Sequence, residues 1–135
     1  MDVTRTQGSI DLQTGALAAV FSKLQALGSG GGAFGITTPT AVAGVRGTAF
    51  YIKVEDPAST YVCTCNGTLT QRAPERKTKI RVTAANHEAY RFSRTSKGVR
   101  RTRAGLLYHD DALMDRLAAE VGTRLIWGSE EESGY

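Results

Sequence analysis

Stretches of alternating apolar and polar residues dominate this chain and predict a mainly β protein. Apolar side chains occupy every second position, among β-branched and aromatic residues, in the segments 8–12, 33–37, 50–54, 60–65, 79–83 and 88–93. Successive side chains of a strand point to opposite faces, so this alternation is typical of strands with one buried face. In the segment 79–83, we expect Ile80 and Val82 to point inward and the charged residues outward.

Turn-forming residues between these segments predict where the chain reverses. A proline follows two acidic residues in the loop 55–59, another lies in the polar loop 72–77, and Lys97-Gly98 forms a basic turn before a ragged strand. Asn66-Gly67 is the strongest short hairpin signal in the sequence. We therefore expect the residues 68–70 to return antiparallel to the strand that precedes this turn.

One segment, Asp110–Val121, has the features of a helix. Its apolar stripe consists of Leu113, Met114, Leu117 and Val121. Asp110 or Asp111 can cap the first turn, and Gly122 can end the helix. The apolar residues 125–127 would then anchor the chain.

Residues 16–27 fit two structures. Their larger apolar residues lie near the spacing of one helical face, and these are Leu17, Val20, Phe21, Leu24 and Leu27. Periodicity alone therefore favours a helix. The glycine-rich run 28–32 is expected to be a flexible connection, because a phosphate-binding loop would need a strand before it and a helix after it.

Length and composition are those of one globular domain. The chain has 135 residues, of which 41% are apolar and 22% charged, and its net charge of +4 is a mild excess. We assign residues 1–128 to a single domain, with the helix 110–121 included, and residues 129–135 to a flexible acidic tail. No apolar run reaches the roughly 18 residues of a membrane span, and the first residues lack the apolar region of a signal peptide. Contact with a membrane would therefore require a segment absent from this chain.

The stretch Thr37–Thr48, with the sequence TTPTAVAGVRGT, precedes the apolar strand 49–54. Pro39 favours an extended conformation of the residue before it. Gly44 and Gly47 flank Arg46, so the backbone can form a bulge or approach a neighbour closely there. We expect Arg46 to serve as a structural charge at this corner.

This stretch and the strand after it resemble the core motif of the FecR domain, a periplasmic module of bacterial iron-citrate signalling proteins and of many envelope proteins. The likeness covers roughly residues 1–70. It implies a twisted antiparallel or solenoid-like stack of short strands closed by one C-terminal helix, and it favours a strand at Gly15–Phe21. It also implies a non-catalytic binding or assembly module of the bacterial periplasm or cell envelope, with regulation through a protein partner as the alternative.

Cys63, Cys65, His87 and His109 are the two cysteines and the two histidines of the chain. Cys63 and Cys65 would share one face of a strand, with Cα atoms roughly 6.5–7 Å apart, which is longer than the about 5.5–6 Å of a typical disulfide. Two thiols and two imidazoles can complete a tetrahedral site for a borderline metal such as Zn²⁺. His87 begins a predicted strand and His109 precedes the predicted helix, and such element ends mount ligands on a rigid scaffold.

A subgroup of FecR-like sequences with a similar Cys-x-Cys and downstream histidines supports this metal site. The signalling members lack these residues, so the resemblance does not imply a role in iron-citrate signalling. Three alternatives stay open: cysteines that are simply small core residues beside surface histidines, a redox-active thiol pair, and a site for iron or an iron–sulfur cluster.

A cluster of cations near the C-terminal third of the chain consists of Arg91, Arg94, Lys97, Arg100, Arg101 and Arg103. Their alternation with apolar residues favours an edge strand that directs cations outward, which discourages pairing between sheets. Binding of an anionic surface or partner is the alternative. Few aromatic residues accompany these cations, so a nucleic-acid surface is disfavoured.

Signatures of an enzyme are weak. The sequence contains no Gly-x-Ser-x-Gly elbow, and neither histidine has a nucleophile at a recognisable spacing. The acidic pair Asp110-Asp111 is more simply explained by the helix dipole than by an acid–base site. We therefore expect a non-catalytic protein that binds a protein partner or assembles with itself.

Overall fold

The structure is a computed structural model that describes residues 9–20, 34–120, 125 and 127. Its strands are β1 (Ser9–Asp11), β2 (Gly15–Val20), β3 (Phe34–Thr37), β4 (Val42–Asp56), β5 (Ser59–Arg72), β6 (Ile80–Ala84), β7 (Glu88–Thr95) and β8 (Gly98–Ala104). One helix, α2 (Asp111–Glu120), follows them. The predicted mainly β fold with one helix near the C-terminus is confirmed.

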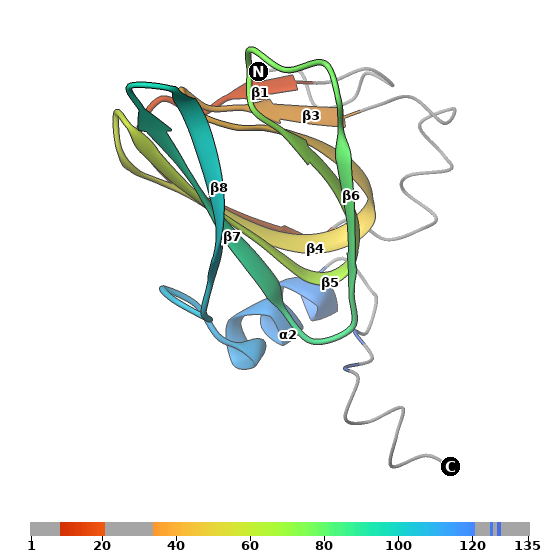
Figure 1. Ribbon diagram of the computed structural model, residues 1–135. Coiled ribbons are helices and arrows are strands. Elements are labelled where there is room, and N and C mark those ends of the chain that lie inside the picture. The colour runs from red at the N-terminus through yellow and green to blue at the C-terminus, as the bar shows by residue number, and fades with distance from the viewer. Residues whose placement is uncertain (1–8, 21–33, 121–124, 126, 128–135) are drawn as a thin grey trace.

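All eight strands belong to one sheet that curls into a half-barrel (Figure 1). The strand order is β1-β3-β4-β5-β7-β8, while β2 pairs with β4 and β6 pairs with β5. The β1–β3 pair is parallel and the other pairs are antiparallel. The long strands β4 and β5 thus pair with each other along one side, and along its other side each pairs with two shorter strands in succession.

The alternation of side chains buries both faces of the sheet. The inner face, on the concave side, holds a cluster that includes Phe50, Ile52, Val62, Leu69 and Phe92. The outer face packs against α2 through a second cluster that includes Tyr51, Tyr61, Cys63, Cys65, Met114 and Trp127. The two cysteines therefore point toward the helix.

Residues 15–20 form a strand, as the FecR resemblance favoured and helical periodicity did not. Leu17 and Ala19 pack against the inner cluster, whereas Ala18 packs against the outer one. This period of two explains why the apolar residues of β2 serve a strand. The rest of the segment, with the glycine run 28–32, lies outside the described residues, as does the predicted tail 129–135.

The prediction of a hairpin at Asn66-Gly67 is wrong. Strand β5 runs without reversal through both residues, and Gly67 has a φ of 116°. Here β5 changes its neighbour, because Thr64 pairs with β7 and Gly67 pairs with β6. The turn-forming residues therefore bend the strand between two partners instead of reversing it.

The predicted corner in TTPTAVAGVRGT is a bulge within β4. The register with β5 shifts between Arg46 and Ala49, and an added Cβ on Gly44 would lie 2.5 Å from the Thr70 Oγ1 atom. The close approach is confirmed at Gly44. The structure describes the backbone of Arg46 and not its side chain, so the structural role of this charge stays a prediction.

Three threonines fix the start of this motif. The Thr40 hydroxyl donates to the backbone carbonyl of Phe92 at 2.9 Å and lies 2.7 Å from the Thr60 Oγ1 atom. Thr38 Oγ1 lies 2.9 Å from the same Thr60 oxygen and accepts the N–H of Ala41. These buried hydroxyls satisfy one another and tie the chain before β4 to β5 and β7.

The remaining predictions for the fold differ in outcome. The carboxylate of Asp110 accepts the N–H of Leu113 at 2.9 Å, so the predicted cap of α2 is confirmed. Leu125 and Trp127 are buried, which confirms the anchor at these two positions. Val82 is buried as predicted, but Ile80 is 39% exposed because it lies at the open rim of the sheet. No helix among the described residues is long and apolar enough to cross a membrane.

Candidate metal centre

A bulge in β5 brings the two thiols together. Ala49 pairs with Asn66 and Phe50 with Thr64, so Cys65 is an extra residue without a partner in β4. The Sγ atoms of Cys63 and Cys65 are 3.6 Å apart, and both residues are free and fully buried. The pair thus forms two convergent donors that are not joined by a disulfide, in agreement with the prediction that it is no ordinary disulfide.

His87 reaches this pair from the connection between β6 and β7. Its φ of 59° is in the left-handed region, which residues other than glycine seldom adopt. The backbone N–H of His87 donates to the carbonyl of Cys65 at 2.9 Å, which continues the register of the β5–β7 pair by one residue. Its Nδ1 atom lies 3.6 Å from the Cys63 Sγ atom.

His109 completes the cluster from the loop between β8 and α2. Its Nε2 atom lies 3.2 Å from the Cys65 Sγ atom, and the four donor atoms all lie within 4.8 Å of one another. Zinc bonds of about 2.3 Å to sulfur and about 2.0–2.1 Å to nitrogen at tetrahedral angles place ligand atoms about 3.4–3.8 Å apart. The spacings of 3.6, 3.6 and 3.2 Å lie close to these values, and the limit of 4.8 Å for the other pairs means that a small contraction would place all four donors around such an ion.

Each imidazole has a hydrogen-bond partner for its second nitrogen. His87 Nε2 contacts the Asp111 carboxylate, and His109 Nδ1 lies 2.6 Å from the backbone oxygen of Leu107. Because these oxygens accept hydrogen bonds, they fix the tautomers that leave His87 Nδ1 and His109 Nε2 free to bind a metal. Such partners orient histidine ligands and raise their basicity in metal sites.

Aromatic residues hold both rings in place. The His109 ring stacks on Tyr51 with centroids 4.4 Å apart, and the His87 ring stacks on Trp127 at 4.8 Å. The Tyr61 hydroxyl donates to the carbonyl of Gly105 at 2.6 Å and accepts the N–H of Leu107 at 3.0 Å, which positions the loop that carries His109. The geometry of the site is thus built by the sheet and the loop together.

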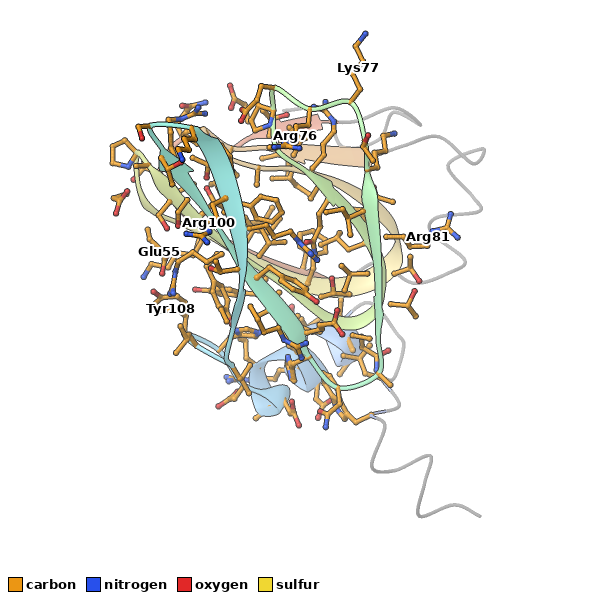
Figure 2. All side chains as sticks on the ribbon, in the orientation of Figure 1. Glu55, Arg76, Lys77, Arg81, Arg100 and Tyr108 are labelled. Atoms are coloured by element: carbon orange, nitrogen blue, oxygen red, sulfur yellow. The ribbon has the colours of Figure 1, made fainter. Side chains whose placement is uncertain are left out.

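The same loop is fixed at Tyr108 on the outer face. The Tyr108 hydroxyl donates to Glu55 at 2.5 Å, and Glu55 also accepts two hydrogen bonds from Arg91, at 2.7 and 2.8 Å. Figure 2 shows Glu55 and Tyr108 close together beside β8. Hydrogen bonds from Arg91 lower the pKa of Glu55 to about 2. The loop is therefore held by a carboxylate that is charged over nearly the whole pH range.

The thiols and imidazoles shift one another's protonation. The hydrogen bond that Cys65 donates lowers the pKa of Cys63 to about 4, and hydrogen bonds from His109 and His87 further stabilise the Cys63 thiolate. The same Cys65–Cys63 hydrogen bond raises the pKa of Cys65, because Cys65 holds the shared proton. Burial lowers the pKa of His87, but hydrogen bonds with Cys63 and Asp111 outweigh it and the net shift is upward. A cation in place of these shared protons would satisfy both sulfur atoms at once.

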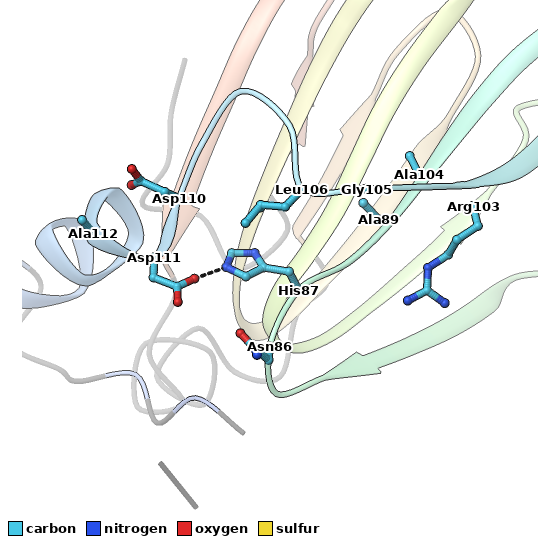
Figure 3. A pocket seen from close by; sticks show the side chains of 10 residues that line it. All are labelled: Asn86, His87, Ala89, Arg103, Ala104, Gly105, Leu106, Asp110, Asp111 and Ala112. Carbon is cyan, nitrogen blue, oxygen red and sulfur yellow. Dashed lines mark hydrogen bonds and ion pairs between the residues drawn. The ribbon is translucent and has the colours of Figure 1, made fainter. Parts of the chain in front are cut away.

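A pocket of about 520 Å³ adjoins the cluster. Its lining includes His87, Asp111, Arg103 and Leu106, which come from the β6–β7 connection, α2, β8 and the following loop (Figure 3). The cysteines are not among its lining residues. The sulfur atoms are thus enclosed, while the outer edge of the His87 ring borders the pocket.

The structure brings together all four residues that the sequence singles out. The contact of Asp111 with His87 was not predicted from the sequence, nor were the positions of Tyr51, Tyr61 and Trp127 around the rings. Only the spacing of Asp111, two residues after His109, offered a signal, and the helix dipole explained it equally well. The aromatic residues gave none, since any strand core contains such side chains.

The basic cluster is divided between two strands: Arg100, Arg101 and Arg103 lie on the edge strand β8, as predicted, whereas Arg91 and Arg94 lie on β7, which is paired on both sides. Strand β8 ends the strand order, and its Arg101 guanidinium lies 3.4 Å from the centroid of the Tyr90 ring. Arg91 is bound by Glu55, and Arg94 lies 3.8 Å from Glu75. The cations of β7 are therefore paired, whereas Lys97 and Arg100 have no ion pair with any residue that the structure describes.

Comparison with known proteins defines the fold alone. The chain matches no protein-family model and no curated protein. Similar solved structures include two crystal structures, at 1.65 and 2.50 Å, of a "putative anti-sigma factor" from Parabacteroides distasonis; each has a TM-score of 0.55 and 17% identity and covers 76% of this chain and 44% of that one. The chain thus spans less than half the length of that protein. It shares a β-rich fold with it, while the FecR resemblance rests on the sequence motif.

Proposed function

We propose that this chain is a non-catalytic, FecR-like binding or assembly module of the bacterial cell envelope, built around a Cys₂His₂ zinc site. The observation that carries the metal site is the convergence of four donor atoms within 4.8 Å, from Cys63, Cys65, His87 and His109. The oxygen partners of both histidines support it, because they select the tautomers that a metal requires.

The zinc would be structural. Four protein ligands fill a tetrahedral ion and leave no position for a substrate, whereas catalytic zinc keeps one position open. The burial of both sulfur atoms agrees with this role. The ion would join three separate segments: the bulge of β5, the β6–β7 connection and the loop before α2.

Metal analysis tests this site. Protein purified without chelator should contain about one zinc per chain by elemental mass spectrometry, as expected for a closed four-ligand site. His87→Ala should lose most of it, while the matched variant Asn86→Ala, one residue away and without a ligand role, should keep it. Less than about 0.2 metal per chain, with no uptake on titration with Zn²⁺, would contradict the site.

The absorption spectrum separates zinc from iron. Zinc is colourless, whereas an iron–sulfur cluster or ferric thiolate absorbs visible light. Fresh protein prepared without oxygen should therefore show no visible band, and replacement of zinc by Co²⁺ should produce the colour of tetrahedral cobalt bound to thiolates. A visible band in the native protein would favour the iron alternative.

A regulatory role through a protein partner is the second candidate. The fold shared with a "putative anti-sigma factor" supports it, since such a factor is by name a regulator that binds another protein. Capture of one defined partner from the source organism by the tagged chain would favour this function. Assembly of the purified chain into oligomers, measured by light scattering, would favour self-assembly instead.

A further inference from the structure

Strand β8 has an open backbone edge. Within the described part of the chain β8 pairs only with β7. The N–H of Val99 points away from β7, since it donates to the carboxylate of Glu75 at 3.2 Å. Alternate residues of an antiparallel strand direct their backbone groups the same way, so those of Arg101 and Arg103 also face outward. β8 thus offers a row of donors and acceptors to a further strand.

The side chains along this edge are cationic. Gly98–Ala104 contains three arginines and no acidic residue, and Lys97 precedes it. Among the described residues, no ion pair involves Lys97, Arg100 or Arg103. A basic or identical strand would be repelled here, which protects the edge against self-pairing. An acidic strand would be attracted by the same charges.

A carboxylate of the chain already occupies one end of the edge. Glu75 accepts the N–H of Val99 through Oε2, and its Oε1 lies 3.8 Å from the guanidinium of Arg94. One carboxylate, that of Glu75, is therefore held by the backbone N–H of β8 and also lies close to a guanidinium of the neighbouring strand. The edge repeats this combination at Arg101 and Arg103, where the described residues supply no carboxylate.

The pocket beside the candidate metal centre opens at the other end of β8. Arg103 and Ala104 line it on this strand, Gly105 lines it directly after the strand, and Ala89 contributes from β7 (Figure 3). Leu106, which is 48% exposed, also lines it. A strand paired along β8 would run into this pocket and could place one apolar side chain there, which would fix its register.

We propose that β8 pairs with an extended acidic segment of a partner protein, which extends the sheet by one strand (β-augmentation). Main-chain hydrogen bonds would give the affinity, and the cations and the pocket would give the specificity. The proposal rests on the binding role proposed above and names the partner's chemistry. The metal would contribute by holding His109 and hence the loop that borders the pocket.

A synthetic peptide tests this surface. The probe is a fluorescent peptide of alternating Glu and Val, as long as β8, and its binding to the whole metal-loaded chain is followed by anisotropy. We expect saturable binding, weakened at least about tenfold when Lys replaces Glu and also when the peptide amides are N-methylated, a change that removes the donors but keeps the charges. Amide exchange should slow at Arg101 and Arg103, and not at Arg100 and Thr102, whose N–H groups face β7.

Matched variants of the protein locate the site. Arg100→Gln/Arg103→Gln should weaken binding of the acidic peptide several-fold, whereas Lys77→Gln/Arg81→Gln, which removes one cation of β6 and one of the loop before it (Figure 2), should leave it unchanged. Circular dichroism checks that both variants fold. An equal loss in both pairs would show that net charge, and not β8, attracts the peptide, and would overturn the proposal.

The remaining outcomes separate this proposal from the metal site. Equal binding of the N-methylated peptide would overturn strand pairing, and tighter binding of a single-stranded oligonucleotide would assign the edge to nucleic acid instead. Metal content is measured on the same sample. If the chain contains one zinc but does not bind the acidic peptide, only the proposal for the β8 edge is refuted. If the chain binds the peptide but contains no metal, only the proposal for the metal site is refuted.

Discussion

The two faces of β5 are held by different chemistry. On the inner face, Thr60 shares hydrogen bonds with Thr38 and Thr40, and apolar residues such as Phe92 fill the space around them. On the outer face, Cys63 and Cys65 meet imidazole nitrogens at distances that suit a shared ion. The threonine hydroxyls of the inner face are satisfied by groups of the chain itself, whereas the outer face places four donors around a point where an ion can bind.

Removal of the metal should cause the largest loss of stability, and this loss should be confined to the outer face. An ion at 1,000 times its dissociation constant stabilises the folded state by about 4 kcal/mol. A strong chelator should therefore lower the free energy of unfolding in urea by about that amount or more. Amide exchange should accelerate in α2 and around His87 and remain slow in the inner-face strands. Uniform acceleration over both faces would contradict the distinction.

Phe92→Ala should destabilise the inner face without touching the metal. Its side chain is 2% exposed within the inner cluster, and truncation of a buried phenylalanine costs about 3 kcal/mol or more. The decrease in the free energy of unfolding in urea should be the same with and without chelator. The zinc content should equal that of the unmodified chain. A loss that vanishes in chelator would mean that the two faces are coupled.

Asp111→Asn should weaken the metal site by a smaller amount. The Asp111 carboxylate contacts the Nε2 atom of His87, and loss of such a partner typically lowers metal affinity 10- to 100-fold, or about 1.4–2.7 kcal/mol. Competition with a zinc-binding dye measures it. Glu120→Gln removes an exposed carboxylate from the other end of α2 and should leave the affinity unchanged; a similar loss there would indicate a general charge effect.

Glu55→Gln should give the smallest effect, visible only in its pH dependence. Arg91 holds the pKa of Glu55 at about 2, below the ordinary value of 4.5. The ion pair therefore contributes stability above about pH 5 and loses it as the pH falls through 2. In metal-free protein, the stability difference between the two chains should be constant at neutral pH and vanish toward pH 2. The side chains are 15% and 35% exposed, so solvent keeps the difference small.

Most strands and the four site residues could be predicted from the sequence, whereas the course of β5 and the contacts around the histidines could not. Alternation located most strands, and the four rare residues named the site, because both signals are carried by residue type. Asn66-Gly67 misled because the same residues that form a hairpin turn can also bend one strand between two neighbours. The role of Asp111 could not be predicted, since its contact with His87 depends on how α2 packs against the β6–β7 connection.

The bulge at Cys65 also bears on how such a site can arise. Thr64 and Leu69 both face the inner cluster, and the extra residue between them accounts for the odd spacing. Deletion of Cys65 would restore a regular strand with Leu69 and Gln71 still directed inward. A single codon, inserted or lost, thus separates a plain strand from one that presents two sulfur atoms, and a lineage could cross between the two without redesigning its core.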